Sequence, residues 1–216
     1  DLSPTVVEGA PMATPLLCEA LRVTTPRAPK GVCLILPYPD APNDEAYKLR
    51  ITPDSLLVYA KTSGGVTCAA ATLLQLCSEK GKLPCVEVSD APAYAWRGVM
   101  LDVSRHFFPL SHLKRQIDIL ARHKMNTLHL HLTDAAGWRM EIKRYPRLTG
   151  KAAWRTKASW KEWWNGDRGY RCEGDSTAYG GYYTQEELRE LVAYARARNI
   201  NIVPEIEMPG HSEEVL

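Results

Sequence analysis

The fold is decided by the stretch MNTLHLHLTDAAGW (125–138), which alternates leucine with histidine and then runs into polar residues. Side chains alternate between the two faces of a strand, so the three leucines share one face and His129 and His131 share the other. The apolar face suits a covering layer of helices, and the polar face suits a functional site. The stretch therefore predicts a buried strand with a site at its carboxyl end.

Two further segments repeat this pattern, RGVMLDVSRHFFP (97–109) and NINIVPEIEMPGH (199–211). Asp102 lies on the polar face of the first, and Glu205 and Glu207 lie on the polar face of the second. Enzymes built on a (β/α)8 barrel place their sites at the carboxyl ends of the strands. We therefore predict three barrel strands whose polar side chains meet at one mouth.

Helical patterns separate these strands, which favours parallel strands with crossover connections. In the first crossover, Ser111 is the expected N-cap, and Leu113, Ile117 and Leu120 form the expected buried stripe. In the second, Thr184-Gln-Glu-Glu187 is a capping box. Its expected buried residues share helical spacing and are Leu188, Leu191, Val192 and Ala195.

The N-terminal part reads as a small α/β domain. Ser63-Gly64-Gly65 is expected to break the chain before a helix over 66–79 that ends at Gly81 as its C-cap. The expected strands are GVCLILP (31–37), a hairpin of AYKLRI (46–51) and SLLVYA (55–60), and LPCVEV (83–88). We predict an α/β fold: a small α/β domain over 1–92, then the first three βα units of a TIM (β/α)8 barrel over 93–216. Such barrels need about 250 residues, so the barrel is expected to be incomplete in this chain.

Composition excludes several classes of function. The 27 basic and 25 acidic residues give a formal charge of +2, without the basic stripe expected of a nucleic-acid partner. No apolar run approaches the roughly 20 residues of a membrane span. The chain begins DLSPTVV, without a basic stretch followed by an apolar one, so we expect no signal peptide in this sequence.

The polar residues fit two chemistries. In a metal-dependent hydrolase, His129 and His131 would be ligands, with Asp134, His211 and the two glutamates, Glu205 and Glu207, as further ligands. In acid/base chemistry on a sugar, carboxylates flank the substrate and tryptophans stack on its ring. Six tryptophans favour the second chemistry, and most lie in or beside the stretch 135–182, where they could equally form a small core beneath the loop.

The chain resembles glycoside hydrolase family 20, the β-N-acetylhexosaminidases. The matching segments are WRGVMLDVSRHFFP (96–109), HKMNTLHLHLTDAAGWRMEIKRYPRL (123–148), YGGYYTQEEL (179–188) and NIVPEIEMPGHS (201–212). Residues 31–90 resemble the small domain that precedes the barrel in this family. The resemblance implies a retaining, substrate-assisted hydrolase of terminal β-linked GlcNAc or GalNAc that needs no metal or other cofactor.

The resemblance also implies roles for single residues. Arg97 is expected to bind hydroxyls of the terminal sugar, and Asp134 with His211 to form a hydrogen-bonded relay that supports the acid. Glu207 stands where the family usually has aspartate and is expected to contact substrate, and Ala135 replaces a common acid. His129 and His131 are then interior packing residues rather than metal ligands.

The family's adjacent aspartate and glutamate on the fourth strand are expected to lie beyond residue 216, because Asp44-Glu45 falls in a loop of the first domain. We therefore expect this chain alone to be inactive, with the rest of the barrel as its partner. Glycan substrates suggest a periplasmic, surface or secreted location. The alternatives are the metal-dependent hydrolase and a non-catalytic glycan-binding fragment.

Overall fold

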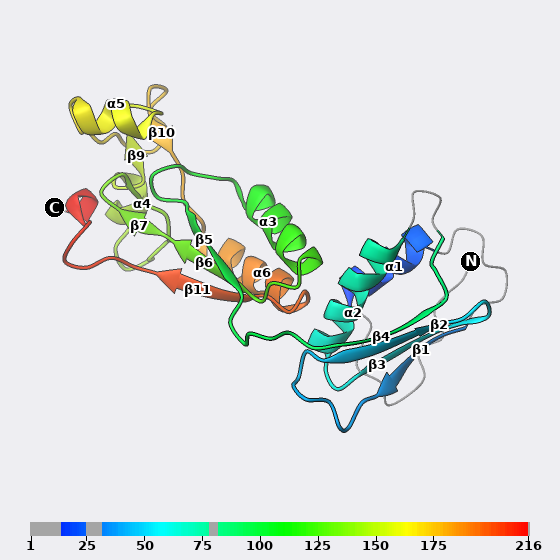
Figure 1. Cartoon of the computed structure of the whole chain (residues 1–216). Helices are drawn as coiled ribbons and strands as arrows, with labels where there is room; N and C mark the ends of the chain where they lie inside the picture. Colours follow the sequence, from blue (N-terminus) through cyan, green and yellow to red (C-terminus); the bar gives the residue numbers. More distant parts are fainter. Residues whose placement is uncertain (1–13, 25–31, 78–81, 216) are drawn as a thin grey trace. The chain divides into compact units, whose positions relative to one another are not determined.

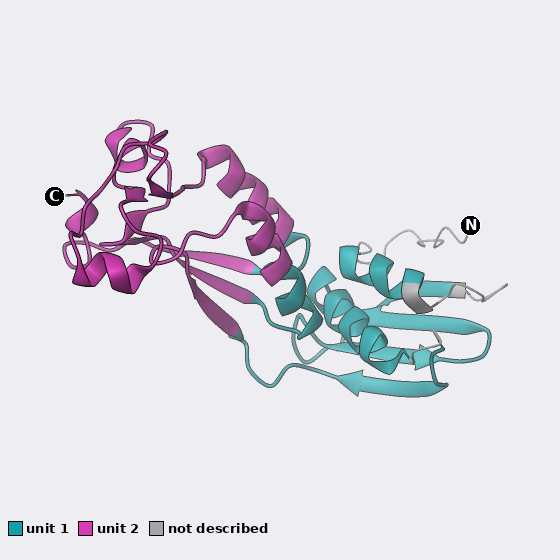
Figure 2. Ribbon diagram, turned by 90° about the horizontal axis from the view of Figure 1, so that it is seen from above, with its two compact units in different colours: residues 1–97, 117–126, 196–200 teal, residues 98–116, 127–195, 201–216 magenta. Residues whose placement is uncertain are grey.

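The computed structural model describes residues 14–24, 32–77 and 82–215. The chain forms two compact units, shown in teal and magenta in Figure 2. Unit 1 consists of residues 1–97, 117–126 and 196–200, and unit 2 of residues 98–116, 127–195 and 201–216. Because unit 1 includes two segments from later in the chain, these units differ from the expected boundary at residue 92, which stays a prediction.

Unit 1 contains a four-stranded sheet in the order β1-β3-β2-β4 (Figure 1). Its strands are β1 (Val32–Pro37), β2 (Tyr47–Ile51), β3 (Ser55–Ala60) and β4 (Val86–Asp90). The hairpin predicted from the sequence is confirmed, since β2 pairs antiparallel with β3, and β1 adds in parallel on the other side of β3. Tyr47, Leu49 and Val58 lie in its buried core.

Two helices, α1 (Pro15–Thr24) and α2 (Ser63–Leu76), complete the core of unit 1. Thr62 caps α2 by accepting a hydrogen bond from Gly64 N at 3.1 Å. Ser63-Gly64-Gly65, predicted to break the chain before the helix, therefore forms its first turn instead. A Cβ at Gly65 would lie 2.6 Å from the Ala46 carbonyl oxygen, which explains glycine there by close packing. The helix ends at Leu76, and the predicted C-cap, Gly81, lies outside the described residues.

Unit 2 contains a parallel three-stranded sheet in the order β11-β6-β5. Its strands are β5 (Gly98–Asp102), β6 (Thr127–His131) and β11 (Asn201–Glu205). All three predicted barrel strands are present and parallel. Leu128 and Leu130 are buried, as the alternating pattern predicts.

Helix α3 (Leu110–Arg122) links β5 to β6, and α6 (Gln185–Arg196) precedes β11. The stripe predicted for α3 is confirmed, because Leu113, Ile117 and Leu120 are buried. Ser111 lies inside α3 and is not its cap. Within the described ranges, no helix has the length and apolar character needed to cross a membrane.

The predicted capping box of α6 is confirmed by reciprocal hydrogen bonds. Glu187 N donates to Thr184 Oγ1 at 3.1 Å, and Thr184 N donates to a Glu187 carboxylate oxygen at 2.8 Å. Leu191 and Ala195 are buried as expected. Val192 is 50% exposed, so its predicted burial is wrong.

The long connection between β6 and α6 folds into short elements around a small core. Trp163 is fully buried there and packs with Ala135 and Ala136, while Trp160 is 38% exposed. At Trp163, therefore, the alternative of a small core beneath the loop is confirmed. The elements are β7 (Thr133–Asp134), β8 (Gly137–Trp138), α4 (Arg147–Gly150), β9 (Trp154–Arg155), α5 (Trp160–Asn165) and β10 (Tyr179–Gly180), and a 3₁₀ turn, η1 (Glu213–Val215), follows β11.

Candidate functional site

Three polar residues stand side by side at the carboxyl edge of the unit 2 sheet. Asp102, His131 and Glu205 are the last residues of β5, β6 and β11, and the strand register pairs both carboxylate residues with His131. The clustering predicted from the three sequence segments is therefore present in the structure. This row forms the base of the candidate site.

Asp134 is the buried carboxylate of the site, with a side chain only 4% exposed. Its Oδ2 contacts Arg105 Nη2 at 2.6 Å, and its Oδ1 accepts a hydrogen bond from Ala135 N at 2.8 Å. Asp102 holds the same guanidinium from the other side, through Oδ2 at 2.9 Å from Nη1. The arginine therefore bridges two carboxylates, one at the end of β5 and one in β7.

Two histidines complete the surroundings of Asp134. His211 Nδ1 lies 2.9 Å from Asp134 Oδ2, and His131 Nε2 lies 3.0 Å from the same oxygen. The structure thus brings Asp134 and His211 together, as the sequence suggested. The His211 side chain is 60% exposed, so it joins the buried carboxylate to solvent.

His131 is charged more readily than an ordinary histidine. Burial lowers its pKa, but hydrogen bonds to the Glu205 and Asp134 carboxylates outweigh burial and leave the pKa raised. Glu205 responds in the opposite direction, because the hydrogen bond from His131 lowers the pKa of this carboxyl. The row therefore favours an imidazolium between carboxylates.

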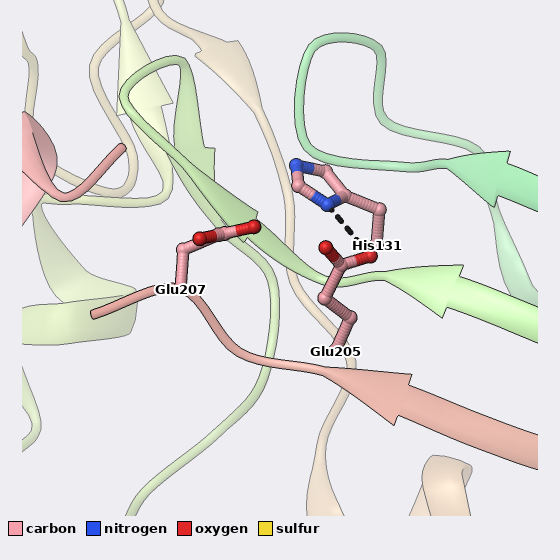
Figure 3. A group of neighbouring side chains, drawn as sticks. All are labelled: His131, Glu205 and Glu207. Atoms are coloured by element: carbon pink, nitrogen blue, oxygen red, sulfur yellow. Dashed lines mark ion pairs between the residues drawn. The ribbon is translucent and has the colours of Figure 1, made fainter. Parts of the chain in front are cut away.

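A group able to hold a metal ion lies at the same edge (Figure 3). One ligand atom each from His131, Glu205 and Glu207 lies within 4.8 Å of the others. His129 is not in this group; its Nε2 pairs with Glu205 at 2.7 Å. Of the ligands predicted from the sequence, the described part of the chain therefore brings His131 and the two glutamates together, and His129 does not join them.

Two hydrogen bonds of its backbone hold Glu207 in position. Its N–H donates to Thr133 Oγ1 at 2.8 Å, and its carbonyl accepts from Ser212 Oγ at 3.0 Å. These bonds fix the segment between β11 and His211. The side chain is half-buried. It lies beside Glu205, as Figure 3 shows, and its expected contact with substrate stays a prediction.

Arg97 belongs to a different arrangement, within unit 1. It immediately precedes β5, and its guanidinium binds both carboxylate oxygens of Glu45, at 2.8 and 2.9 Å. The same guanidinium also donates to the carbonyls of Tyr94 and Lys124. These partners take four of its five N–H donors, so the structure supports a structural role for Arg97 in place of the expected contact with sugar.

Arg105 is the arginine that the sequence reasoning missed. It follows β5 by three residues, on the side where barrel sites lie, whereas Arg97 stands at the opposite end of the same strand. Its side chain is 30% exposed, so the guanidinium can also reach a ligand. The position of the two arginines relative to the strand was the signal available in the sequence.

A second buried acid lies in the same unit. The Glu214 carboxylate oxygens have no hydrogen-bond partner among the described residues, and the residue is 7% exposed. Burial raises the pKa of the Glu214 carboxyl from 4.5 to about 7, and the negative charge of Asp134 adds to the effect. Glu214 is therefore a group that titrates near neutral pH.

The arrangement suits proton transfer and the binding of hydroxyl groups. Asp134 is oriented by a guanidinium, a backbone N–H and two imidazoles, so it can hold His211 in a fixed orientation and tautomer. A histidine so oriented can stabilise a neighbouring acid or pass a proton to it. Guanidinium and carboxylate groups also form the hydrogen bonds that sugar hydroxyls need.

Comparisons with known proteins match this organisation. Residues 94–216 match the catalytic domain of glycosyl hydrolase family 20, and residues 16–91 match domain 2 of that family. The chain is 40% identical over 196 residues to the beta-hexosaminidase of Porphyromonas gingivalis, an alignment that covers 86% of this chain and 23% of that protein. It is 36% identical over 221 residues to the beta-N-acetylhexosaminidase of Cellulomonas fimi, covering 98% of this chain and 41% of that protein.

Solved structures agree. The GH20 exo beta-N-acetylglucosaminidase of Vibrio harveyi, solved with N-acetylglucosamine, superimposes with a TM-score of 0.75 at 36% identity, covering 93% of this chain and 31% of that one. The chain thus spans well under half the length of these relatives. The family model for the catalytic domain alone covers more than half of this chain. The chain belongs to glycosyl hydrolase family 20.

Proposed function

We propose that this chain carries part of the active site of a retaining β-N-acetylhexosaminidase. The enzyme would remove terminal β-linked GlcNAc or GalNAc from glycans. The single observation that carries the proposal is the Asp134–His211 contact at 2.9 Å, placed at the carboxyl edge of three parallel strands. The names of the relatives from P. gingivalis and C. fimi support the same class of activity.

The proposed reaction is substrate-assisted. The 2-acetamido oxygen attacks the anomeric carbon as the glycosidic bond breaks, and a glutamic acid gives its proton to the leaving oxygen. Water, deprotonated by the same glutamate, then opens the oxazolinium intermediate, so the sugar keeps its configuration. Asp134 and His211 would support that glutamic acid through their hydrogen bond.

Arg105 would contact the sugar. Its guanidinium is held by Asp102 and Asp134 and remains partly exposed at the edge of the sheet. A guanidinium fixed in this way can donate to a sugar hydroxyl with little further loss of side-chain freedom. This role replaces the one expected for Arg97.

The acid glutamate and its aspartate partner would come from further βα units. The sequence holds one adjacent Asp-Glu pair, Asp44-Glu45, and Glu45 is bound to Arg97, Asn126 and Asn199 in unit 1. Glu45 therefore has a structural role in unit 1, and Asp44-Glu45 is not the proposed catalytic pair. A periplasmic, surface or secreted location follows from the glycan substrate and belongs to the same proposal.

The test compares two polypeptides on an aryl β-N-acetylglucosaminide. We expect a polypeptide that contains all eight βα units to release the aryl group, and the 216-residue chain alone to release none. Turnover by the short chain would place the acid within these residues and overturn the assignment. Binding of GlcNAc by the complete polypeptide without any turnover would favour a glycan-binding protein.

A metal-dependent hydrolase is the second candidate, favoured by the grouping of His131, Glu205 and Glu207 within 4.8 Å. One histidine and two carboxylates suit zinc with a bound water. Stoichiometric zinc in the purified complete enzyme, with activity lost on chelation and regained with zinc, would support this candidate. Full activity in the presence of a chelator would exclude it.

A further inference from the structure

Two arginines of unit 2 are fully buried without a carboxylate partner. Arg139 and Arg155 are both 0% exposed, and no ion pair to either occurs among the described residues. Buried arginines are normally paired with an acid, because an unpaired buried charge is costly. In both residues, backbone carbonyl groups take the place of the acid.

Arg139 uses its whole guanidinium in this way. Nε donates to Val103 O at 3.1 Å, Nη1 to Ala153 O at 2.5 Å and to Gly181 O at 2.9 Å, and Nη2 to Ser104 O at 2.7 Å and to Ala136 O at 3.4 Å. Five carbonyls from four segments therefore converge on one side chain. Burial, and then the neighbouring charge of Arg155, lowers the pKa of Arg139 to about 10, so it stays charged at neutral pH.

The packing around this guanidinium leaves little room for movement. A Cβ at Gly137 would lie 2.4 Å from the Arg139 Cζ, so a side chain there would displace the guanidinium. The ring of Phe107 covers the guanidinium at 5.7 Å. Arg139 thus occupies a closed cage whose shape a smaller or more flexible side chain would not reproduce.

Two of the five carbonyls belong to the segments that carry the site. Ser104 immediately precedes Arg105, and Ala136 lies two residues after Asp134. Ser104 Oγ adds a second link, because it donates to Gly137 O at 2.8 Å. The same guanidinium therefore fixes the backbone on both sides of the 2.6 Å contact between Arg105 and Asp134.

We propose that Arg139 is a positioning residue of the active site, which holds the segments of Arg105 and Asp134 in the register that their contact requires. It touches neither substrate nor the reacting atoms, and it acts through the backbone carbonyls of Ser104 and Ala136. The kinetic tests of this inference rest on the proposed function, whereas the crystallographic Arg105–Asp134 distance tests it independently.

Arg155 provides a matched control. It is equally buried and also binds carbonyls, but these belong to Lys157 at 2.7 Å, Ala158 at 2.5 Å and Ala136 at 3.5 Å. Arg155 shares the Ala136 carbonyl with Arg139, but none of its partners lies in the segment of Arg105, which Arg139 binds through Ser104 O. Loss of either guanidinium should destabilise unit 2, while loss of Arg139 should disturb the Arg105–Asp134 contact far more than loss of Arg155.

The experiment compares Arg139→Met, Arg139→Lys and Arg155→Met in the complete enzyme. We expect both methionine variants to lower Tm. Arg139→Met should lower kcat for an aryl β-N-acetylglucosaminide by about a hundredfold, the effect of a displacement of about 1 Å at a site. Arg155→Met should stay within about threefold of wild type, the size of effect left when substrate positioning is intact.

Two further readouts separate positioning from mere stability. Methylguanidinium, but not methylammonium, should restore part of kcat to Arg139→Ala. In crystal structures, the Arg105–Asp134 contact should lengthen in Arg139→Lys and remain in Arg155→Met.

The inference is overturned if Arg139→Lys keeps the wild-type kcat and the wild-type Arg105–Asp134 distance. It is also overturned if Arg139→Met and Arg155→Met change kcat equally. Should Arg139→Met not fold, the lysine variant decides, with an expected fall in kcat of about tenfold. If the wild type hydrolyses no hexosaminide, the proposed function fails, and the crystallographic distance alone still decides the positioning role.

Discussion

Arg105 and Asp134 show how burial turns one ion pair into a sensitive element of the site. Asp134 is 4% exposed, so water cannot replace a lost partner, and Arg105 supplies the contact at 2.6 Å. Exposed pairs contribute about 0–1 kcal/mol, whereas removing one partner of a buried pair costs about 3–5 kcal/mol. The arginine therefore matters to the geometry of Asp134 as well as to substrate binding.

The first prediction contrasts the two arginines of one segment. We expect Arg105→Met to lower kcat/KM for an aryl hexosaminide about a hundredfold or more, because Asp134 loses its guanidinium and the sugar loses a donor. Arg97→Met should lower Tm and leave KM within about threefold, since Arg97 binds Glu45. Steady-state kinetics and thermal unfolding of both variants provide the measurement. A larger rise of KM in Arg97→Met than in Arg105→Met would restore the original assignment.

The second prediction concerns Glu214. Its pKa is raised to about 7 from 4.5, so between these pH values the folded protein keeps a proton that the unfolded chain has released. The free energy of unfolding must therefore fall as pH rises through this window. At about 1.4 kcal/mol per pKa unit, the loss is of order 3 kcal/mol above pH 7.

Glu214→Gln should remove this dependence. We expect the variant to match the wild type near pH 4 and to exceed its stability above pH 7, measured by chemical denaturation across the pH range. Glu213→Gln is the control, because Glu213 is the exposed neighbour and its substitution should change the curve little. A Glu214→Gln curve parallel to that of the wild type would show that Glu214 is ionised normally.

At the scale of elements, the third prediction tests the cap of α6. Thr184→Ala should cost about 1 kcal/mol of stability, because Glu187 N loses its acceptor at the helix start. Ser111→Ala is the control, since Ser111 lies inside α3, and it should cost less than about 0.5 kcal/mol. Urea denaturation measures both. Equal losses in the two variants would contradict the assigned caps.

The elements that depend on local pattern could be predicted from the sequence. The strands around Asp102, His131 and Glu205 follow from alternation, and the cap of α6 follows from the spacing of Thr184 and Glu187. The start of helix α3 was misread by two residues, because the Pro109 carbonyl already accepts the first helical hydrogen bond, from His112 N.

Contacts between distant parts of the sequence could not be predicted. Arg97 meets Glu45 across 52 residues of sequence, and no periodicity within either segment encodes that pairing. The same holds for the carbonyl cage of Arg139, whose partners are backbone atoms of any residue type. Side-chain patterns report which face is buried, and tertiary packing decides which partners meet there.

For the whole molecule, the open sheet of unit 2 leads to the fourth prediction. The three-stranded sheet ends at β5 and β11 in the described structure, and Val99 and Met100 on β5 are 43% and 54% exposed. Unpaired strand edges with apolar side chains favour association. We expect the 216-residue chain to self-associate in analytical ultracentrifugation, whereas a monodisperse monomer with cooperative unfolding would contradict this.

The measurement that tests the central claim most directly is the rate of the complete enzyme on aryl glycosides that differ only in their 2-acyl group. If the substrate's own amide oxygen is the nucleophile, kcat should fall steeply from N-acetyl through N-fluoroacetyl to N-trifluoroacetyl, because fluorine withdraws electrons from that oxygen. A flat series would contradict substrate-assisted catalysis and require a nucleophile from the protein or from a metal-bound water.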